Sequence, residues 1–180
     1  MKSDRQFGLL ITWTCYGTWL PGDSRGYVSN LQVNPTRWLP KENAPGSPCR
    51  SDDPYAHAQA SRRQQHKTIH LDRRQAACVA ASLVETARSR AWRVLSARIM
   101  ANHVHVVVTD CPNDGPAVRR ILKGTTQASL NRLAGAPHKW WTRGGSNRYL
   151  NGSDHIEAAI KYVEDQEFVL AGVDDMKVLP

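Results

Sequence analysis

The segment between positions 72 and 108 constrains the fold most, because a strong helix signal is followed at once by two strand signals. Asp72 and Gln75 have the spacing of a capping box, and apolar residues then recur at helical spacing to about Arg90. Residues 92–99 alternate between apolar and polar side chains, and residues 104–108 are rich in valine, as is typical of strands. This segment therefore predicts a helix followed by a β-hairpin.

The segments on either side of this one predict four further elements of secondary structure. They are a strand at residues 7–16, a helix at residues 114–133, a short extended piece at residues 139–141, and a helix at residues 154–170. Pro116 and Gly135 mark the two ends of the second helix, and Asp154 with Glu157 could cap the third. The order βαββαβ predicts an α+β, ferredoxin-like antiparallel sheet with an added C-terminal helix.

The proline distribution predicts a long insertion after the first strand. Six of the ten prolines fall between positions 21 and 54, together with several turn-forming residues. Residues 21–68 are therefore predicted to form an irregular insertion, and residues 173–180 a C-terminal tail. A chain of 180 residues is long enough for one compact domain with a sizeable core, so we expect a single domain over residues 1–180.

The charge is concentrated in one part of the chain. Residues 61–150 carry 16 basic and 4 acidic side chains, whereas residues 151–180 carry 2 and 7. A basic segment of this size indicates a phosphate-rich partner, although solubility accounts for part of such an excess. No apolar run approaches the roughly 20 residues of a membrane-spanning helix, so no membrane partner is expected. The four cysteines lie about thirty residues apart and form no CxxC pair for zinc or redox chemistry.

His103 and His105 form the most specific local motif. Residues two apart on a strand point to the same face, so the two imidazoles could hold a metal ion together. The valines at 104, 106 and 108 would then face the core on the opposite side of the sheet. A pair of solvent-facing histidines is an equally good interpretation of this motif when it is considered alone.

The C-terminal helix supplies possible partners for these histidines. His155, Tyr162 and Gln166 follow one line along it, beside a buried apolar stripe. If the helix packs near the histidine strand, Gln166 could offer its amide oxygen as a third metal ligand. Tyr162 could then point its hydroxyl at a group bound to the metal. A tyrosine at the margin of an amphipathic helix is more often a core residue with a solvated tip.

These residues together resemble a known family. Residues 100–108, a following basic helix and a later Tyr-x-x-x-Gln resemble the HUH-type single-tyrosine transposases of the insertion-sequence-200 class. Within that class the long chain, the single tyrosine and the inserted N-terminal loop are most similar to the REP-associated tyrosine transposases. Ala101 departs from the proline common before the asparagine in that family, which leaves the ligands untouched.

The resemblance implies a metal-dependent enzyme that nicks single-stranded DNA and transfers the strand through a 5′-phosphotyrosine intermediate. Tyr162 would be the nucleophile, and His103, His105 and Gln166 the metal ligands. The implied metal is Mg2+, with Mn2+ as a substitute, and the implied partner is single-stranded or hairpin DNA. A monomer is favoured over a homodimer, and a cytoplasmic, nucleoid-associated location is expected.

Basic residues interleaved with aromatic ones predict the surface that would bind the DNA. This set comprises Arg119, Arg120, Lys123, Lys139, Trp140, Arg143 and Arg148.

Two alternatives to this enzyme remain open. The chain could be a domesticated, catalytically weak or inactive relative that binds hairpin DNA, or a metal-dependent nuclease that uses water. The second alternative predicts that a Tyr162→Phe variant still cleaves. A phosphoesterase with two His-x-Thr/Ser repeats is excluded, because neither His103 nor His105 is followed by such a hydroxyl.

Overall fold

The structure is a computed structural model that describes residues 7–20, 22–23, 32–34, 37–38 and 53–179. The chain divides into two compact units, residues 1–16 with 69–180 and residues 17–68. The first unit contains the predicted helix and hairpin, and the second contains the whole of the predicted insertion.

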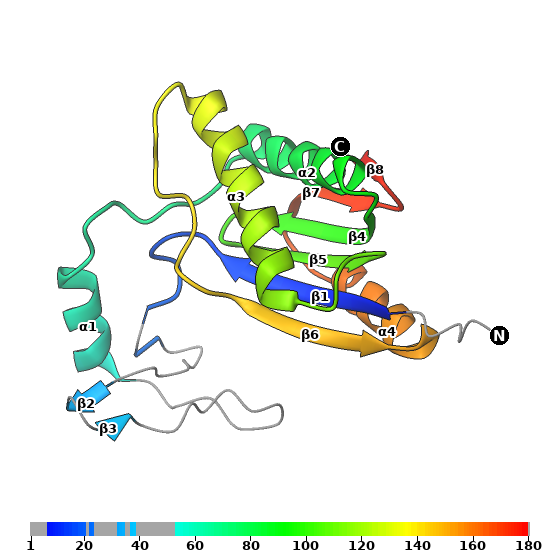
Figure 1. Cartoon of the computed structure of the whole chain (residues 1–180). Coiled ribbons are helices and arrows are strands. Elements are labelled where there is room, and N and C mark those ends of the chain that lie inside the picture. The colour runs from blue at the N-terminus through cyan, green and yellow to red at the C-terminus, as the bar shows by residue number, and fades with distance from the viewer. Residues whose placement is uncertain (1–6, 21, 24–31, 35–36, 39–52, 180) are drawn as a thin grey trace. The chain divides into compact units, whose positions relative to one another are not determined.

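The larger unit is built on a six-stranded antiparallel sheet (Figure 1) with the strand order β6-β1-β5-β4-β7-β8. These strands are β1 (Phe7–Thr14), β4 (Arg93–Met100), β5 (His103–Thr109), β6 (Ser146–Asn151), β7 (Val169–Asp174) and β8 (Lys177–Leu179). Helix α2 (Arg73–Ser89) connects β1 to β4, and helix α3 (Gly115–Ala134) connects β5 to β6. Taken in chain order, β1, α2, β4, β5, α3 and β6 have the ferredoxin-like βαββαβ order. The predicted fold class is confirmed.

The sheet is covered by helices on both faces (Figure 1), with a separate apolar cluster on each. Leu9, Ile11 and Trp13 of β1 pack with the buried stripes of α2 and α3 in the larger cluster. Leu10 of β1 and Val107 of β5 face the other way, toward helix α4 (Ser153–Glu164). The alternation of strand side chains thus divides each central strand between two cores.

The first two long helices begin and end where the sequence predicts. Asp72 and Gln75 form a complete capping box at the start of α2. The side chain of Asp114 accepts a hydrogen bond from the Ala117 amide at the start of α3, and Gly135 ends that helix with a φ of 69°. A glycine adopts this left-handed conformation without the steric cost of a β-carbon.

The C-terminal segment differs from its prediction. Helix α4 ends at Glu164 rather than continuing to residue 170, and its N-cap is Gly152, with no side-chain cap from Asp154 or Glu157. The apolar stripe stops at Val163 because Gln166 and Glu167 are polar, and the run from Val169 forms β7. Residues 173–180 were predicted as a tail, but the described part of this stretch completes β7 and forms β8.

The last strand of the βαββαβ unit also lies later than predicted. Trp141 makes one isolated bridge with Cys15, and the strand itself is β6 at Ser146–Asn151. This strand lies at the edge of the sheet, and Leu150 is its one buried side chain. An edge strand with so little apolar character carries a weak sequence signal.

The smaller unit contains regular structure within the predicted irregular insertion. Helix α1 spans Pro54–Arg62, with Asp53 capping it through the Ala56 amide, and β2 (Gln32–Asn34) pairs antiparallel with β3 (Arg37–Trp38). Most of residues 21–52 lie outside the described part of the chain.

Candidate functional site

Strand β5 places both histidines on the face of the sheet that helix α4 covers. His103 and His105 share this face with Val107, whereas Val104, Val106 and Val108 are buried against α2 and α3. The two imidazole rings are 4.8 Å apart between centroids and meet edge to face, at 89°. The predicted orientation of the alternating histidines and valines is confirmed.

Each histidine has a polar neighbour at its Nδ1 atom. Thr12 lies opposite His105 on β1, and its Oγ1 is 2.7 Å from His105 Nδ1. The Oδ1 of Asn102 is 2.6 Å from His103 Nδ1. Since an amide oxygen accepts a hydrogen bond, this contact favours a proton on Nδ1 of His103 and suits Nε2 to metal binding. Second-shell contacts of this kind orient metal-binding histidines.

His105 is kept neutral by its surroundings. The residue is 6% exposed, and burial, with a smaller contribution from neighbouring His103, lowers the pKa of His105 to about 4. A metal ligand must be the neutral imidazole, so the buried position suits His105 to ligation at neutral pH.

Helix α4 brings Tyr162 to the histidine pair. Ile156, Ala159 and Val163 anchor the helix on the sheet, and Tyr162 projects beside this buried stripe. Its ring centroid lies 5.4 Å from that of His105, and the residue is 49% exposed. A phenol at this position is close to the histidines and remains accessible to a macromolecular substrate.

Gln166 lies just beyond the helix rather than on it. Its backbone amide donates to the Val163 carbonyl, and its side-chain Nε2 donates to the Tyr162 carbonyl at 2.9 Å. The hydrogen bond therefore ties Gln166 to the tyrosine turn, and not to either histidine. Among the described residues no third His, Cys, Asp or Glu side chain joins the histidine pair to form a metal site. Within the described part of the chain, a third protein ligand would therefore be of another type, as Gln166 is.

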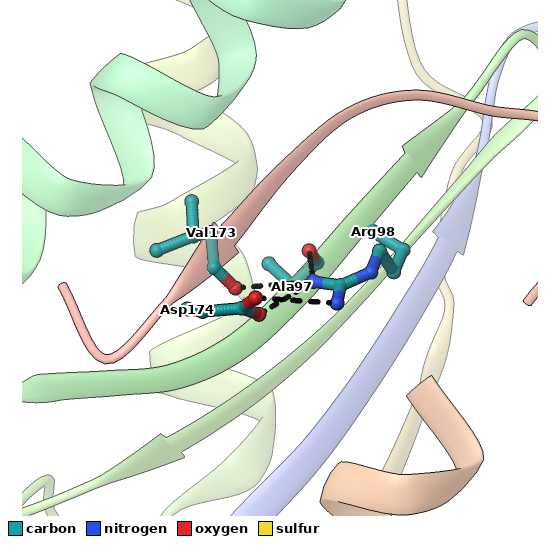
Figure 2. Close-up of polar contacts among 4 residues, drawn as sticks. All are labelled: Ala97, Arg98, Val173 and Asp174. Carbon is teal, nitrogen blue, oxygen red and sulfur yellow. Dashed lines mark hydrogen bonds and ion pairs between the residues drawn. The ribbon is translucent and has the colours of Figure 1, made fainter. Parts of the chain in front are cut away.

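Sequence reasoning missed Arg98, which is the cross-strand neighbour of His105 on β4. Figure 2 shows its guanidinium held by Asp174 of β7, with Nη1 donating to Oδ1 at 2.7 Å. Nη1 also donates to the carbonyls of Ala97 and Val173. The interaction joins β4 to β7 beside the site, and Gly172, opposite Arg98, leaves room for it. Asp174 lies within residues 173–180, which the sequence predicts to be a tail, so no sequence signal pointed to this pair.

Two of the predicted DNA-binding cations hold the connection between α3 and β6. Lys123 Nζ donates to the carbonyls of Thr142 and Gly144, each at 2.6 Å. Arg119 donates to the Gly145 carbonyl and to Asn147 Oδ1. Burial and the positive charge of Arg119 lower the pKa of Lys123 to about 8. Both residues lie on α3, on the face of the sheet away from the histidines.

We predict that Lys123→Met destabilises the protein by about 1–3 kcal/mol, since it removes two charge-assisted hydrogen bonds. Urea unfolding measures this loss, and Arg120→Met, which replaces an exposed cation on the same helix, is the control. The salt dependence of DNA binding is expected to stay the same. A slope reduced by about one at unchanged stability would instead make Lys123 a phosphate contact.

The remaining predicted DNA-binding residues differ in accessibility. Trp140 is 5% exposed, and its Nε1 donates to Asn131 Oδ1. The ring is part of the α2/α3 core and is not available to contact DNA, so the structure does not support the prediction of Trp140 as a DNA-binding residue. Lys139 is exposed and lies over the Tyr16 ring, and Arg143 and Arg148 are also exposed. Arg148 lies on β6 opposite Leu10, so it shares the face of the histidines.

The fold and the site together define an α+β protein in which a His-x-His strand faces a tyrosine-bearing helix. Neither the models of known protein families nor the sequences of curated proteins match this chain. Among solved structures, the chain is similar to a REP-associated tyrosine transposase bound to a REP hairpin, at 9% identity and a TM-score of 0.44. The match covers 88% of this chain and 65% of that one. No helix in the described part of the chain is long and apolar enough to cross a membrane.

Proposed function

We propose that this protein is a metal-dependent enzyme that nicks single-stranded DNA and transfers the strand through a covalent tyrosine intermediate. It would be an HUH-type single-tyrosine transposase, most similar to the REP-associated branch. One observation carries the proposal: the His105 ring lies 4.8 Å from His103 and 5.4 Å from Tyr162. Two potential metal ligands and an accessible phenol thus meet on one face of the sheet.

The donor set fits a divalent cation that also binds phosphate. His103 and His105 would hold it through Nε2, because an oxygen atom lies next to Nδ1 in both residues. Gln166 would be the third ligand through Oε1, since its Nε2 donates to the Tyr162 carbonyl. Phosphate and water oxygens would complete the shell, which favours Mg2+ or Mn2+. The cation would supply positive charge against the scissile phosphate.

Tyr162 would then act as the nucleophile. Its Oη forms a bond to phosphorus and releases the phenolic proton to solvent. The bond from phosphorus to the 3′ oxygen breaks, and that oxygen keeps the electron pair and takes up a proton to become a 3′-hydroxyl. The phosphotyrosine ester preserves the energy of the phosphodiester, so another 3′-hydroxyl can reverse the reaction and reseal DNA.

The partner would be single-stranded or hairpin DNA. The net charge of +8 and the exposed Arg143 and Arg148 support a phosphate-rich partner. All three groups of the site come from one chain, which supports an active monomer with its tyrosine acting in cis. A Mg2+- or Mn2+-dependent protein–DNA adduct on labelled hairpin pools tests the proposal. Cleavage without an adduct, or binding without cleavage, would contradict it.

We predict that Thr12→Val weakens the apparent metal affinity about tenfold or more, because the valine removes the hydroxyl that orients His105. The measurement is the Mn2+ concentration that half-saturates adduct formation. Thr14→Val is the matched control, since the Thr14 hydroxyl bonds to Thr142 instead. If both variants shift the Mn2+ dependence equally, Thr12 has no specific role in holding His105.

A further inference from the structure

A cavity of about 400 Å3 opens beside Tyr162, between α4 and the strands β1 and β6. It lies on the sheet face that carries the histidines. Its lining includes Leu10, Thr12, Arg148, His155, Ala158 and Tyr162. His155 lies seven residues before Tyr162 on α4, and the chemistry proposed above gives it no role. The volume is within the range of pockets that bind small organic ligands.

The cavity has apolar walls and a cationic rim. Leu10 is 9% exposed, and Leu150 and Ala159, which also line it, are 2% and 6% exposed. Arg148 lies on β6 opposite Leu10, and both Arg148 and His155 are exposed. An apolar slot accepts the flat face of a base, and an adjacent guanidinium binds phosphate. Both properties fit one nucleotide of a DNA strand.

The cavity is continuous with the candidate active site through two shared residues. Tyr162 lines the cavity and also contacts the His105 ring. Thr12 lines it too, and its hydroxyl lies against His105 Nδ1. A nucleotide in the cavity would therefore lie next to a phosphate positioned at the histidines.

We propose that this cavity is a subsite for one nucleotide of the substrate strand, adjacent to the phosphodiester that Tyr162 attacks. The base enters between α4 and β1, and Arg148 and His155 bind the phosphate on its far side. This inference rests on the proposed function, because the strand in the cavity is the strand that the tyrosine cleaves.

The test fills the cavity and measures binding of single-stranded DNA. Ala158 is exposed on α4 and lines the cavity, so Ala158→Trp occupies the space without changing charge or removing a core residue. The probes are a fluorescently labelled oligothymidylate 12-mer and a labelled 12-mer of abasic sites. Fluorescence anisotropy measures the affinity of the protein for each strand. We expect Ala158→Trp to weaken binding of oligothymidylate about tenfold and to leave the abasic strand within twofold. Ala128→Trp, at an exposed alanine of α3, is the control and binds both strands like the wild type.

A second variant tests the phosphate contact independently of steric filling. Arg148→Gln is expected to lower the salt slope of oligothymidylate binding by about one, and Arg88→Gln, on the last turn of α2, leaves it unchanged. Thermal unfolding verifies that each variant is folded. The subsite is overturned if Ala158→Trp weakens the binding of both strands equally. It is also overturned if oligothymidylate binding is unchanged in both Ala158→Trp and Arg148→Gln.

The two proposals fail in different ways. A wild-type protein that forms the covalent adduct but tolerates Ala158→Trp retains the proposed function and loses the subsite. A wild-type protein that neither binds oligothymidylate nor forms an adduct on hairpin pools loses both.

Discussion

His103→Ala is expected to abolish metal-dependent cleavage and adduct formation while single-stranded DNA binding stays within about twofold. The side chain lies on the α4 face, is partly exposed, and packs edge to face against the His105 ring. Its removal takes away a proposed metal ligand and leaves the cavity beside Tyr162 intact. Loss of the charge that a metal would supply to the scissile phosphate removes several kcal/mol of transition-state stabilisation. The cleavage rate is therefore expected to fall at least about a thousandfold.

The control for His103→Ala is His70→Ala, which removes an exposed histidine outside the site. A denaturing gel measures cleavage at fixed Mn2+, and filter binding measures affinity in its absence. Cleavage by His103→Ala at a rate within tenfold of the wild type would contradict the assignment of this residue as a metal ligand. Equal loss of cleavage in His70→Ala would show that the effect is not specific to the histidine pair.

Tyr162→Phe is expected to abolish both the adduct and cleavage, with no detectable product. Phenylalanine keeps the ring against His105 and removes only the hydroxyl that would attack phosphorus. Because Tyr162 is 49% exposed, the substitution removes no buried hydrogen bond and little stability is lost. The measurement is the yield of labelled protein and of shortened DNA on a denaturing gel.

Tyr149→Phe is the matched control, because Tyr149 is 45% exposed and its hydroxyl instead accepts a hydrogen bond from the Gly115 amide. It lies on the α3 face of β6, away from the histidines. Normal adduct formation is expected from this variant. Cleavage that survives Tyr162→Phe would make water the nucleophile and the protein a metal-dependent nuclease.

The core of the fold could be predicted from local signals that tertiary packing reinforces. The capping box at Asp72 and the alternation from His103 to Val108 each specify an element and the face that it buries. The same alternation predicted that the two histidines would face away from the valine core. Helix α4 packs on that second face, and this position brings Tyr162 into contact with His105.

The differences arise where long-range contacts override local pattern. The run from Phe168 to Leu170 looks like the continuation of an apolar helix stripe, yet β4 offers an unpaired edge, and Val169 pairs with Met100 there. Trp140 lies between basic residues, as a base-stacking residue would, but burial against α2 and α3 is favoured because it removes a large apolar ring from water. Local sequence carries no information about either contact.

The partners of the charged side chains were the least predictable part of the structure. The sequence predicts Lys123 and Arg119 as DNA-binding residues, and in the structure both side chains donate hydrogen bonds to carbonyls of the turn before β6. Arg98 and Asp174 are 76 residues apart in sequence and meet only because β7 pairs with β4. Partners of long charged side chains depend on strand order, which a single sequence does not specify.

Replacement of Gln166 tests whether this residue is the third ligand of the proposed metal site. Its amide now donates to the Tyr162 carbonyl, and ligation requires the amide oxygen to reach the metal. We expect Gln166→Ala to weaken the Mn2+ dependence of adduct formation and to leave hairpin binding unchanged. A protein that binds hairpin DNA tightly, but forms no adduct at any Mn2+ concentration, would be the inactive relative.

Mass spectrometry of the trapped protein–DNA adduct tests the proposed nucleophile most directly. The adduct would be formed with hairpin DNA pools and Mn2+, digested with nuclease and protease, and sequenced as modified peptides. We expect a nucleotide phosphate on Tyr162, within the peptide that spans α4. A nucleotide on Tyr149 or another residue, or complete cleavage of the DNA with every tyrosine unmodified, would contradict the proposal that Tyr162 attacks the strand.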